Sequence, residues 1–464
     1  MKLNQLTWLV LLAGCACATP ELAAQDVPIA QPESPSSPVM ITEPMQTPIT
    51  PDEHPLSGVQ TLGIGSWGLR HSVLTPSLRL VETLESNPLL LSSNSGGYRG
   101  FSSVAGDVQW IQYIGRDAEI RYSGALRYDT IGSVEGYDRF TNTHTASISK
   151  NRRFRTWGLV IRDEAEYSQG SNFGASGMGG MGLTGQTGLL GVLGGTGLQP
   201  NLLPNQSILT GQIGRITNTA VAEVDAHFNP RSTATLSFSY GLLHYDSSQL
   251  TDSQQASVTG GYNRIITARD SIALEGAFTR YFYPSSVGSM NTESISALYA
   301  RRISGRSSIE VGGGPEITQS SFSAGGQNIV GWQARGTVQY RTRVVKLSAQ
   351  GTHGVTGGAG VLDGTTTTTG QGTLNLVFSR DWSAALHSGI SRNQQLNGAQ
   401  RYDTQFAGFT LYRKVSVDTN LFLSYDFQRQ TTASVCTGLT CSYVGSGNIF
   451  GIGFAWTHRP ISVE

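Results

Sequence analysis

The residues best suited to acid–base chemistry are three alternate side chains, Glu223, Asp225 and His227. Alternate positions of an extended strand point to the same side, so these two carboxylates and one imidazole would share a face. Two further histidines, His244 and His387, fall on other expected strands. A general acid or base needs a partner within hydrogen-bond reach, and neither a GxSxG nor an HExxH run is present. We therefore expect no enzymatic activity, no cofactor and no resident metal.

The four cysteines of the chain form two pairs with different expected chemistry. Residues 1–18 have the basic, apolar and small-residue order of an export signal peptide. Within it, the run 12–15 resembles a bacterial lipobox, which would make Cys15 a lipidated N-terminus, whereas the run 16–18 fits an ordinary signal-peptidase site. Both processing routes stay open. Cys436 and Cys441 lie in one loop, and outside the inner membrane this spacing predicts a disulfide that closes a short ring.

A proline-rich linker separates the signal from the rest of the chain. Residues 19–57 hold nine of the 17 prolines and no Lys or Arg. Such a segment buries too little apolar surface to fold, so we expect a disordered or polyproline-like periplasmic stretch. It would act as a spacer or as a ligand for the cell wall or a periplasmic partner. The folded domain is then expected over residues 58–464.

A repeat of arginines indicates the elements that must position these side chains. Eight arginines recur about every 37 residues, with one gap of about twice that length, which is typical of stacked copies of one structural unit. Each falls in a very short turn, and a longer stretch rich in Ser, Thr, Gly, Asn and Gln lies midway between turns. A cation in the turn could contact lipid phosphates, or turn chemistry alone could place it there. The eight are Arg116, Arg153, Arg231, Arg269, Arg306, Arg343, Arg380 and Arg413.

This hairpin array predicts an all-β fold, a closed antiparallel transmembrane β-barrel of about 18 strands with a range of 16–20. Segments such as 118–128, 330–341 and 420–428 alternate apolar with polar residues, as a wall between lipid and water must. Short turns would be periplasmic and long loops external, in the bacterial outer membrane, with a periplasmic N-terminus. Only 14% of residues are charged, with no net charge, and nucleic acid is not an expected partner.

One charge does not fit this alternation. Asp163 falls on the apolar face of the strand expected at 156–167, where a carboxylate facing lipid would be costly. A bulge or a different register would remove the conflict.

The inward faces of the expected strands carry both signs of charge. They either line a hydrated channel that steers polar solutes or only wet the wall of a wide barrel. Both signs are present, so no ion selectivity is predicted. The expected lining residues are Glu119, Arg121, Arg127, Arg162, Glu164, Glu166, Glu223, Asp225, Arg335, Arg341, Asp418 and Asp426, with His227 on the same face.

A glycine-rich insertion interrupts the repeat. Residues 167–214 contain no Asp, Glu, Lys, Arg or His, and twelve glycines fall between Gly170 and Gly197. A surface loop is normally charged, so this loop either folds into the lumen as a constriction or remains a low-complexity surface loop.

Two short runs resemble known outer-membrane proteins. Gly451, Phe454 and Trp456 resemble the C-terminal signal read by the barrel-assembly machinery, although Phe450 precedes them and eight residues follow. The run 74–87 resembles the opening strand of barrels linked to exopolysaccharide systems, which implies an exit path for polysaccharide and possible periplasmic export partners. The further expected partners are outer-membrane lipid and the assembly machinery.

Three functions follow from these patterns. The first is a porin-like, water-filled channel for passive passage of polar solutes. The second is a conduit for exopolysaccharide export. The third, from a different class, is a structural or surface-binding barrel plugged by the loop 167–214.

Overall fold

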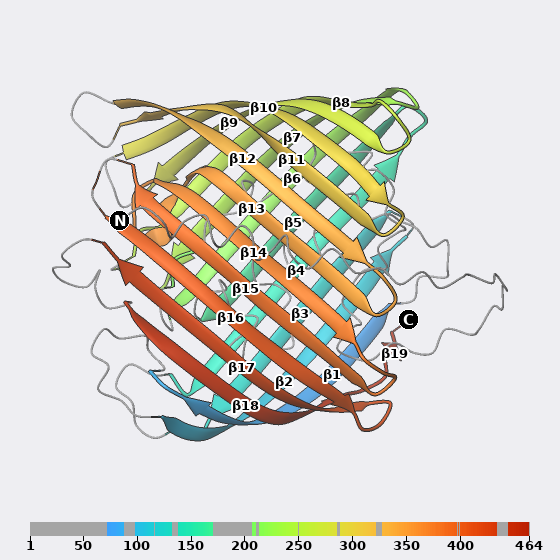
Figure 1. Cartoon of the computed structure of the whole chain (residues 1–464), viewed down its shortest axis with the longest axis vertical. Helices are drawn as coiled ribbons and strands as arrows, with labels where there is room; N and C mark the ends of the chain where they lie inside the picture. The colour runs from blue at the N-terminus through green and yellow to red at the C-terminus, as the bar shows by residue number, and fades with distance from the viewer. Residues whose placement is uncertain are drawn as a thin grey trace. The chain divides into compact units, whose positions relative to one another are not determined.

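The period-two alternation is realised as a closed wall of antiparallel strands, β1 to β18, in the computed structural model of the chain (Figure 1). Strand β1 pairs with both β2 and β18, which closes the sheet on itself. The expected fold class and the expected strand number are both confirmed. The structure describes residues 72–87, 98–115, 117–131, 138–169, 207–209, 213–248, 250–284, 288–321, 327–396, 398, 400–433 and 444–463.

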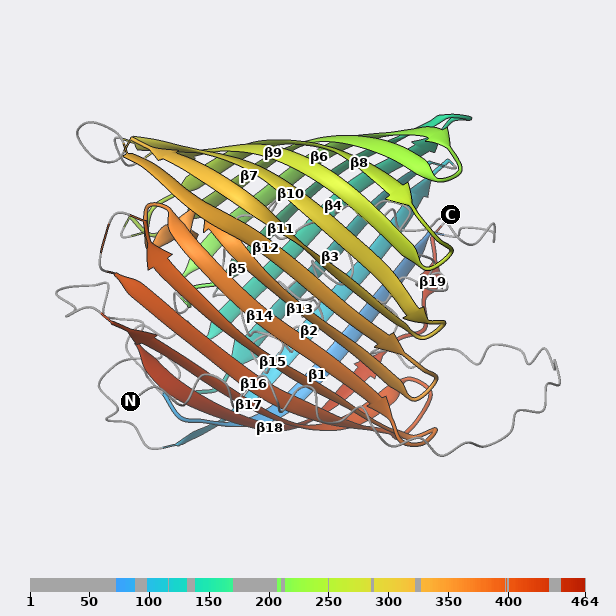
Figure 2. The same ribbon diagram turned by 45° about the horizontal axis from the view of Figure 1, so that its top comes forward.

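The strands follow one another around the wall in sequence order, each paired with its neighbours, and run obliquely to its ends (Figures 1 and 2). A short strand, β19, continues beyond β18. A 3-10 turn, η3 (Gly358–Gly360), lies between β13 and β14. The strands are β1 (Val73–Glu85), β2 (Arg99–Ile114), β3 (Ala118–Asp129), β4 (Phe140–Arg153), β5 (Trp157–Gln169), β6 (Gly214–Asn229), β7 (Ser232–Tyr245), β8 (Ser253–Ile265), β9 (Asp270–Tyr283), β10 (Gly288–Ser304), β11 (Ser307–Ser320), β12 (Gln327–Arg341), β13 (Val345–Thr356), β14 (Thr365–Val377), β15 (Trp382–Gln395), β16 (Arg401–Lys414), β17 (Thr419–Thr432), β18 (Gly445–Thr457) and β19 (Ile461–Ser462).

The two faces of the wall have opposite chemistry. Large apolar side chains point outward and stay exposed, among them Leu126 (57%), Leu274 (59%) and Ile452 (61%). The alternate positions point inward and are dominated by Ser, Thr, Asn and charged residues. An apolar exterior around a polar interior is the pattern of a barrel that spans a bilayer. Among the described residues, no helix is long and apolar enough to cross a membrane.

The short connections are built by side-chain bonds to the turn backbone. Arg231 N–H donates to the Oδ1 of Asn229 at 2.9 Å, and Arg306 N–H to the Oγ of Ser304 at 3.1 Å. These Asx and Ser/Thr turns favour a tight reversal two residues after the acceptor. The sequence repeat therefore reflects turn chemistry at these positions. Of the eight arginines, Arg231, Arg269, Arg306, Arg343 and Arg380 lie in short turns, Arg153 and Arg413 lie at the ends of β4 and β16, and Arg116 falls outside the described residues.

A run of three glycines in β11 lets the wall bend sharply. A Cβ on Gly314 would collide with the carbonyl oxygen of Ile295 in β10, and one on Gly313 would lie 2.7 Å from the carbonyl oxygen of Gln333 in β12. Glycine is therefore required here by close backbone approach. The adjacent Pro315 lacks a backbone N–H and suits a point where the ladder is interrupted.

Asp163 lies on the outward face without a bulge or a change of register. Its strand pairs continuously with both neighbours, Asp163 opposite Ile148 and Ala220. The amide of Asn218, on the next strand, donates to Asp163 Oδ1 at 2.9 Å. The expected bulge or change of register was therefore wrong. Asn218 on β6 donates a hydrogen bond to the carboxylate instead.

The chain end beyond β18 extends the wall. After Trp456, His458 N–H donates to the carbonyl of Pro76, and β19 pairs with the start of β1, Ile461 opposite Leu74. The residues that follow the expected assembly signal thus belong to the sheet. Gly451, Phe454 and Trp456 lie in β18, with both aromatic residues on the outward-facing parity of Ile452.

Candidate functional site

Nearly all of the residues expected to line the interior lie on the inward side of their strands. They alternate with exposed apolar residues such as Ile161 and Leu423. Asp418 is different, because it lies in the turn between β16 and β17, with its Oδ1 3.5 Å from Arg459 Nε. The inward residues are Glu119, Arg121 and Arg127 on β3, Arg162, Glu164 and Glu166 on β5, Glu223 and Asp225 on β6, Arg335 and Arg341 on β12, and Asp426 on β17.

Charges of opposite sign are paired along single strands. Arg127 Nε lies 2.7 Å from Asp129 Oδ1, and Arg162 Nη2 lies 2.6 Å from Glu164 Oε2. Arg121 and Glu119 form a third pair of the same spacing. Residues two apart on a strand share a face, so each pair is neutralised locally. These three pairs therefore add polarity to the inner wall at β3 and β5 without adding net charge.

Arg335 joins three strands across the bend in the wall. Its Nη2 lies 3.1 Å from Glu275 Oε2 on β9, and its Nε lies 3.5 Å from Glu310 Oε1 on β11. This reach crosses the point where the β10–β11 pairing is interrupted and the glycines at 312–314 let the neighbouring backbones approach closely. This cation balances two carboxylates, one of which is buried.

The residues expected to be capable of acid–base chemistry do not converge. Asp225 Oδ1 accepts a hydrogen bond from the Thr235 hydroxyl at 2.6 Å, and His227 Nδ1 lies 3.2 Å from Thr233 Oγ1. His387 instead pairs with Asp426 at 2.8 Å, across Gly408 of β16. In the described part of the chain, no group of three or more His, Cys, Asp or Glu residues is arranged to hold a metal ion.

A loop between β13 and β14, residues 357–364, folds inward at the end opposite the short turns and is called the plug loop below. The carbonyl of Gly360 accepts a bond from Thr251 N–H at 2.7 Å, and that of Gly364 accepts one from Leu396 N–H at 3.2 Å. The first donor lies between β7 and β8, so it ties the loop to a distant part of the wall. The second bond continues the β14–β15 ladder beyond Thr365 and Gln395. Positive φ angles at Gly358 (82°), Gly360 (76°) and Gly364 (76°) fit glycine.

Apolar side chains pack around the plug loop. Leu362 is buried against Ile208 and Tyr402, and Val361 contacts the cluster of Leu243 and Tyr245. Gly360 sits directly on the Tyr245 ring, where any side chain would collide. Burying these residues removes apolar surface from water and holds the loop in place.

A described fragment of the glycine-rich insertion also lies inside the barrel. Gln430 on β17 accepts from Leu209 N–H at 2.8 Å and donates to the Leu209 carbonyl at 2.9 Å. The Ser207 hydroxyl donates to Asn393 Oδ1 at 2.9 Å. Residues 207–209 belong to the connection between β5 and β6, and they bind the inner wall at β15 and β17. Residues 170–206 lie outside the described residues. So do Cys15, Cys436, Cys441, the expected signal 1–18 and the linker 19–57.

Asp363 is the one charged residue of the plug loop. Its Oδ1 is buried without a hydrogen-bond partner in the structure. Burial penalises the charged form and raises the pKa of this carboxyl above its ordinary value.

The plug loop was not recognised from the sequence. The run 357–364 contains four glycines and reads as an ordinary turn-rich connection. The available signal was Val361-Leu362, an apolar pair in a loop expected to face water. An unpaired apolar pair among glycines favours a loop that folds inward.

Comparison with solved structures finds other large outer-membrane barrels, at low similarity. The outer membrane protein OpdK of Pseudomonas aeruginosa is 9% identical over 83% of this chain and 98% of its own, with a TM-score of 0.40. OccK2 (OpdF) of the same organism is 8% identical over 85% and 98%, with a TM-score of 0.41. OccAB3 of Acinetobacter baumannii is 9% identical over 83% and 99%, with a TM-score of 0.39.

No protein-family model and no curated protein matches the chain. TM-scores of this size leave the function to be inferred from the barrel's own residues.

Proposed function

We propose that the barrel is an outer-membrane channel for passive passage of polar solutes, narrowed at its external end by the plug loop and residues 207–209. A wall of 18 strands encloses a space too wide for its own side chains to fill. The observation that carries the proposal is the inward row of ion pairs, including Arg121, whose side chain is 41% exposed. Paired but accessible charges fit a lumen that holds water.

The short-turn end faces the periplasm in this proposal, and the N-terminus with it. Long connections belong on the external side of such barrels. Outer-membrane lipid then surrounds the apolar exterior, and the barrel-assembly machinery inserts the chain by reading Gly451, Phe454 and Trp456 in β18. Cys436 and Cys441 would form their disulfide in the last external loop.

The plug loop bears differently on the two other expected functions, polysaccharide export and a plugged structural barrel. Export of a polysaccharide needs a passage that is wide along its whole length, and an inward loop bonded to Thr251 and packed on Ile208 does not favour this. A plugged structural barrel is compatible with the same contacts. Conduction therefore decides between a channel and a permanently closed barrel.

The test is conductance of the purified protein in planar bilayers. We expect steady conductance that rises several-fold when residues 358–363 are replaced by two glycines, because the bond from Thr251 to Gly360 and the packing of Leu362 are lost. Deletion of 170–197 is expected to raise conductance as well. Shortening of 90–95, in the β1–β2 connection, is the matched control and should leave conductance unchanged. Absence of conductance in every variant would establish a closed structural barrel.

A further inference from the structure

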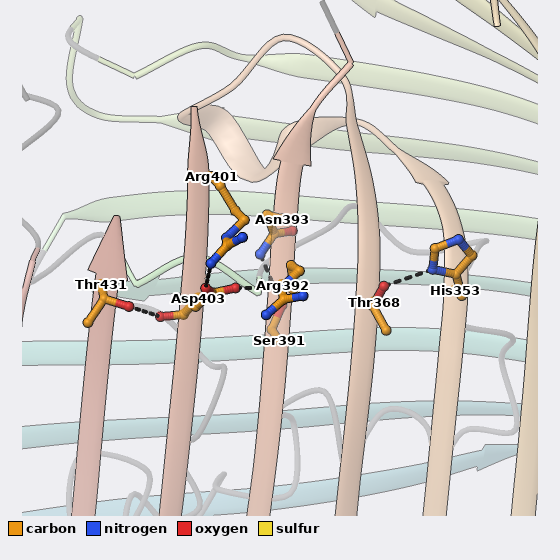
Figure 3. A network of polar contacts seen from close by, with 8 residues as sticks. All are labelled: His353, Thr368, Ser391, Arg392, Asn393, Arg401, Asp403 and Thr431. Atoms are coloured by element: carbon orange, nitrogen blue, oxygen red, sulfur yellow. Dashed lines mark hydrogen bonds and ion pairs between the residues drawn. The ribbon is translucent and has the colours of Figure 1, made fainter. Parts of the chain in front are cut away.

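A cluster of arginines lies on the lipid side of the wall at its external end. Figure 3 shows Arg392 of β15 and Arg401 of β16 converging on the carboxylate of Asp403. Arg392 Nε is 2.8 Å from Oδ1, and Arg401 Nη2 is 2.7 Å from Oδ2. Arg429, on the outward face of β17, is opposite Gln405, two residues beyond Asp403. Three arginines and one aspartate leave two positive charges in excess.

The cluster stands at the upper edge of the apolar band. Ile390, which precedes Arg392 on the same face of β15, is 60% exposed, and Leu423 on β17 is 45% exposed. Charged side chains at this height reach the headgroup layer of the surrounding lipid. Both arginine side chains stay accessible from outside, since Arg392 is 56% exposed and Arg401 is 36% exposed.

We propose that Arg392, Arg401 and Arg429 bind the phosphorylated headgroup of an outer-leaflet lipid. Guanidinium groups match phosphate oxygens with paired hydrogen bonds. Asp403 fixes the first two side chains before the lipid arrives, which lowers the entropy lost on binding. Basic clusters of this kind recognise anionic headgroups at a membrane surface.

Native mass spectrometry of the refolded, lipid-free barrel tests this, with bisphosphorylated lipid A as the probe. We expect one retained lipid, and at least about tenfold weaker retention in the Arg392→Gln/Arg401→Gln variant, about 1.4 kcal/mol. Arg280→Gln, a lone outward arginine on β9, is the matched control and should bind normally. Heat-modifiable migration of each variant checks that it has folded.

Three outcomes would overturn the proposal. Equal retention of dephosphorylated lipid A would mean that acyl chains alone hold it. Unchanged retention in the double variant would mean that the lipid sits elsewhere. Retention of inorganic phosphate by the wild-type barrel, without any retained lipid A, would assign the cluster to free anions instead.

Independently of the arginine cluster, β13 parts from β12 before it reaches the plug loop. The β12–β13 ladder begins at Ala334 opposite His353 and runs to the short-turn end. Beyond it, β12 continues to Gln327 and pairs with β11 alone, and 354–356 pair with β14 alone. Among the described strands, the β12 edge above Ala334 therefore has no partner on that side.

Groups inside the barrel replace the missing ladder bonds of β13. Val355 N–H donates to Glu316 Oε2 at 3.0 Å, and the Tyr281 hydroxyl donates to the Val355 carbonyl at 3.3 Å. Gly354 still lies beside β12, because a Cβ on it would be 3.5 Å from the Cβ of Gln333. The strand thus turns inward directly after Gly354.

Resting on the proposed channel, we infer that the plug opens when 354–356 pair with the free edge of β12. The existing register, extended by three residues, would place Val355 opposite Trp332 and Thr356 opposite Gly331. Ladder bonds would then replace the bonds from Glu316 and Tyr281, so both arrangements satisfy the backbone. Pairing in this register would draw the plug loop toward the wall.

Engineered cysteines test the open register. Residues opposite each other on antiparallel strands have Cα atoms about 4.5–5.5 Å apart, within disulfide reach. We expect Gly331→Cys/Thr356→Cys to cross-link on mild oxidation and to hold conductance high until it is reduced. Gln339→Cys/Ser348→Cys, already opposite in the ladder, is the matched control and should cross-link without changing conductance.

Cross-linking tests the pairing of β13 with β12, and conductance tests whether that pairing opens a channel. No 331–356 cross-link, while the control pair reacts, would overturn the pairing. A cross-link with unchanged conductance in a barrel that conducts would overturn its role in opening. A cross-link in a barrel that never conducts would leave the pairing intact and overturn the channel. Tyr281→Phe, which removes one inward bond and keeps the ring, should accelerate cross-linking.

Discussion

At the scale of single residues, the inner wall is organised by local neutralisation. Arg335 is the clearest case, since one guanidinium balances Glu275 and Glu310 at the bend in the wall. A charge pair in a wet lumen contributes little to stability. Its larger effect is on the field that a passing ion meets.

Substituting Arg335 should therefore change selectivity. Arg335→Gln leaves two carboxylates without their cation, and we expect the reversal potential in a salt gradient to move by several millivolts toward cation preference. The double variant Arg335→Gln/Glu275→Gln restores the balance and should move it back. Unchanged reversal potentials would place Arg335 away from the conducting path.

Sequence-based prediction at this scale succeeded where it depended on alternation. Inward or outward position followed from period two for residues as far apart as Glu119 and Asp426. It failed for Asp163, because its partner Asn218 lies across the glycine-rich insertion and joins it only once β5 and β6 pair. It also failed for Asp418, because a strand boundary within the turn is set by hydrogen bonding rather than by polarity.

At the scale of elements, the strands were predictable and the plug loop was not. Each strand carries its own periodic signal, whereas the plug loop depends on contacts with residues far away in sequence, such as Thr251 and Tyr402. The bend at 312–314 was predictable only in part. Its glycines are visible in the sequence, but the need for them comes from the backbone of β10.

Gly314→Ala tests that need. The added methyl group would collide with the carbonyl of Ile295, so we expect a loss of about 3 kcal/mol or more, or failure to fold. Gly336→Ala on β12 is the matched control, since its Cβ would meet Glu310 O at an ordinary 3.7 Å. Urea unfolding in lipid vesicles and heat-modifiable migration give the readouts. Equal stability of the two variants would contradict the bend.

Asp363 should make plug closure depend on pH. Burial raises the pKa of its carboxyl, so the closed loop is most stable when this group is protonated and loses stability as pH rises from 3.8 through the raised pKa. The Tyr283 phenol, which interacts with Asp363, stays neutral over this range. We expect open probability to rise as pH increases above 3.8.

Asp363→Asn removes the titrating group and should flatten that profile. Asp138→Asn, an exposed carboxyl at the external end, is the control and should retain the wild-type slope. A profile that falls with rising pH, or one that Asp363→Asn leaves unchanged, would rule out this carboxyl as the cause.

At the scale of the whole molecule, closure of the wall depends on the two ends of the chain. Strand β1 pairs with β18 from Ser77 to Glu85, and β19 then covers the first residues of β1. A closed barrel leaves no edge in lipid, so this seam is as necessary as any internal ladder. The expected assembly signal lies in the same seam.

Removal of 459–464 separates the stability of the seam from its assembly. The truncated chain loses the pairing of Ile461 with Leu74 and Ser462 with Val73, and we expect about 1–2 kcal/mol less stability to urea in vesicles. It keeps Phe454 and Trp456, so insertion into the outer membrane of cells should continue. Phe454→Ala/Trp456→Ala should instead reduce insertion in cells while refolding in detergent is retained. If the truncation blocked insertion and the double substitution did not, the assembly signal would lie in the extension rather than in β18.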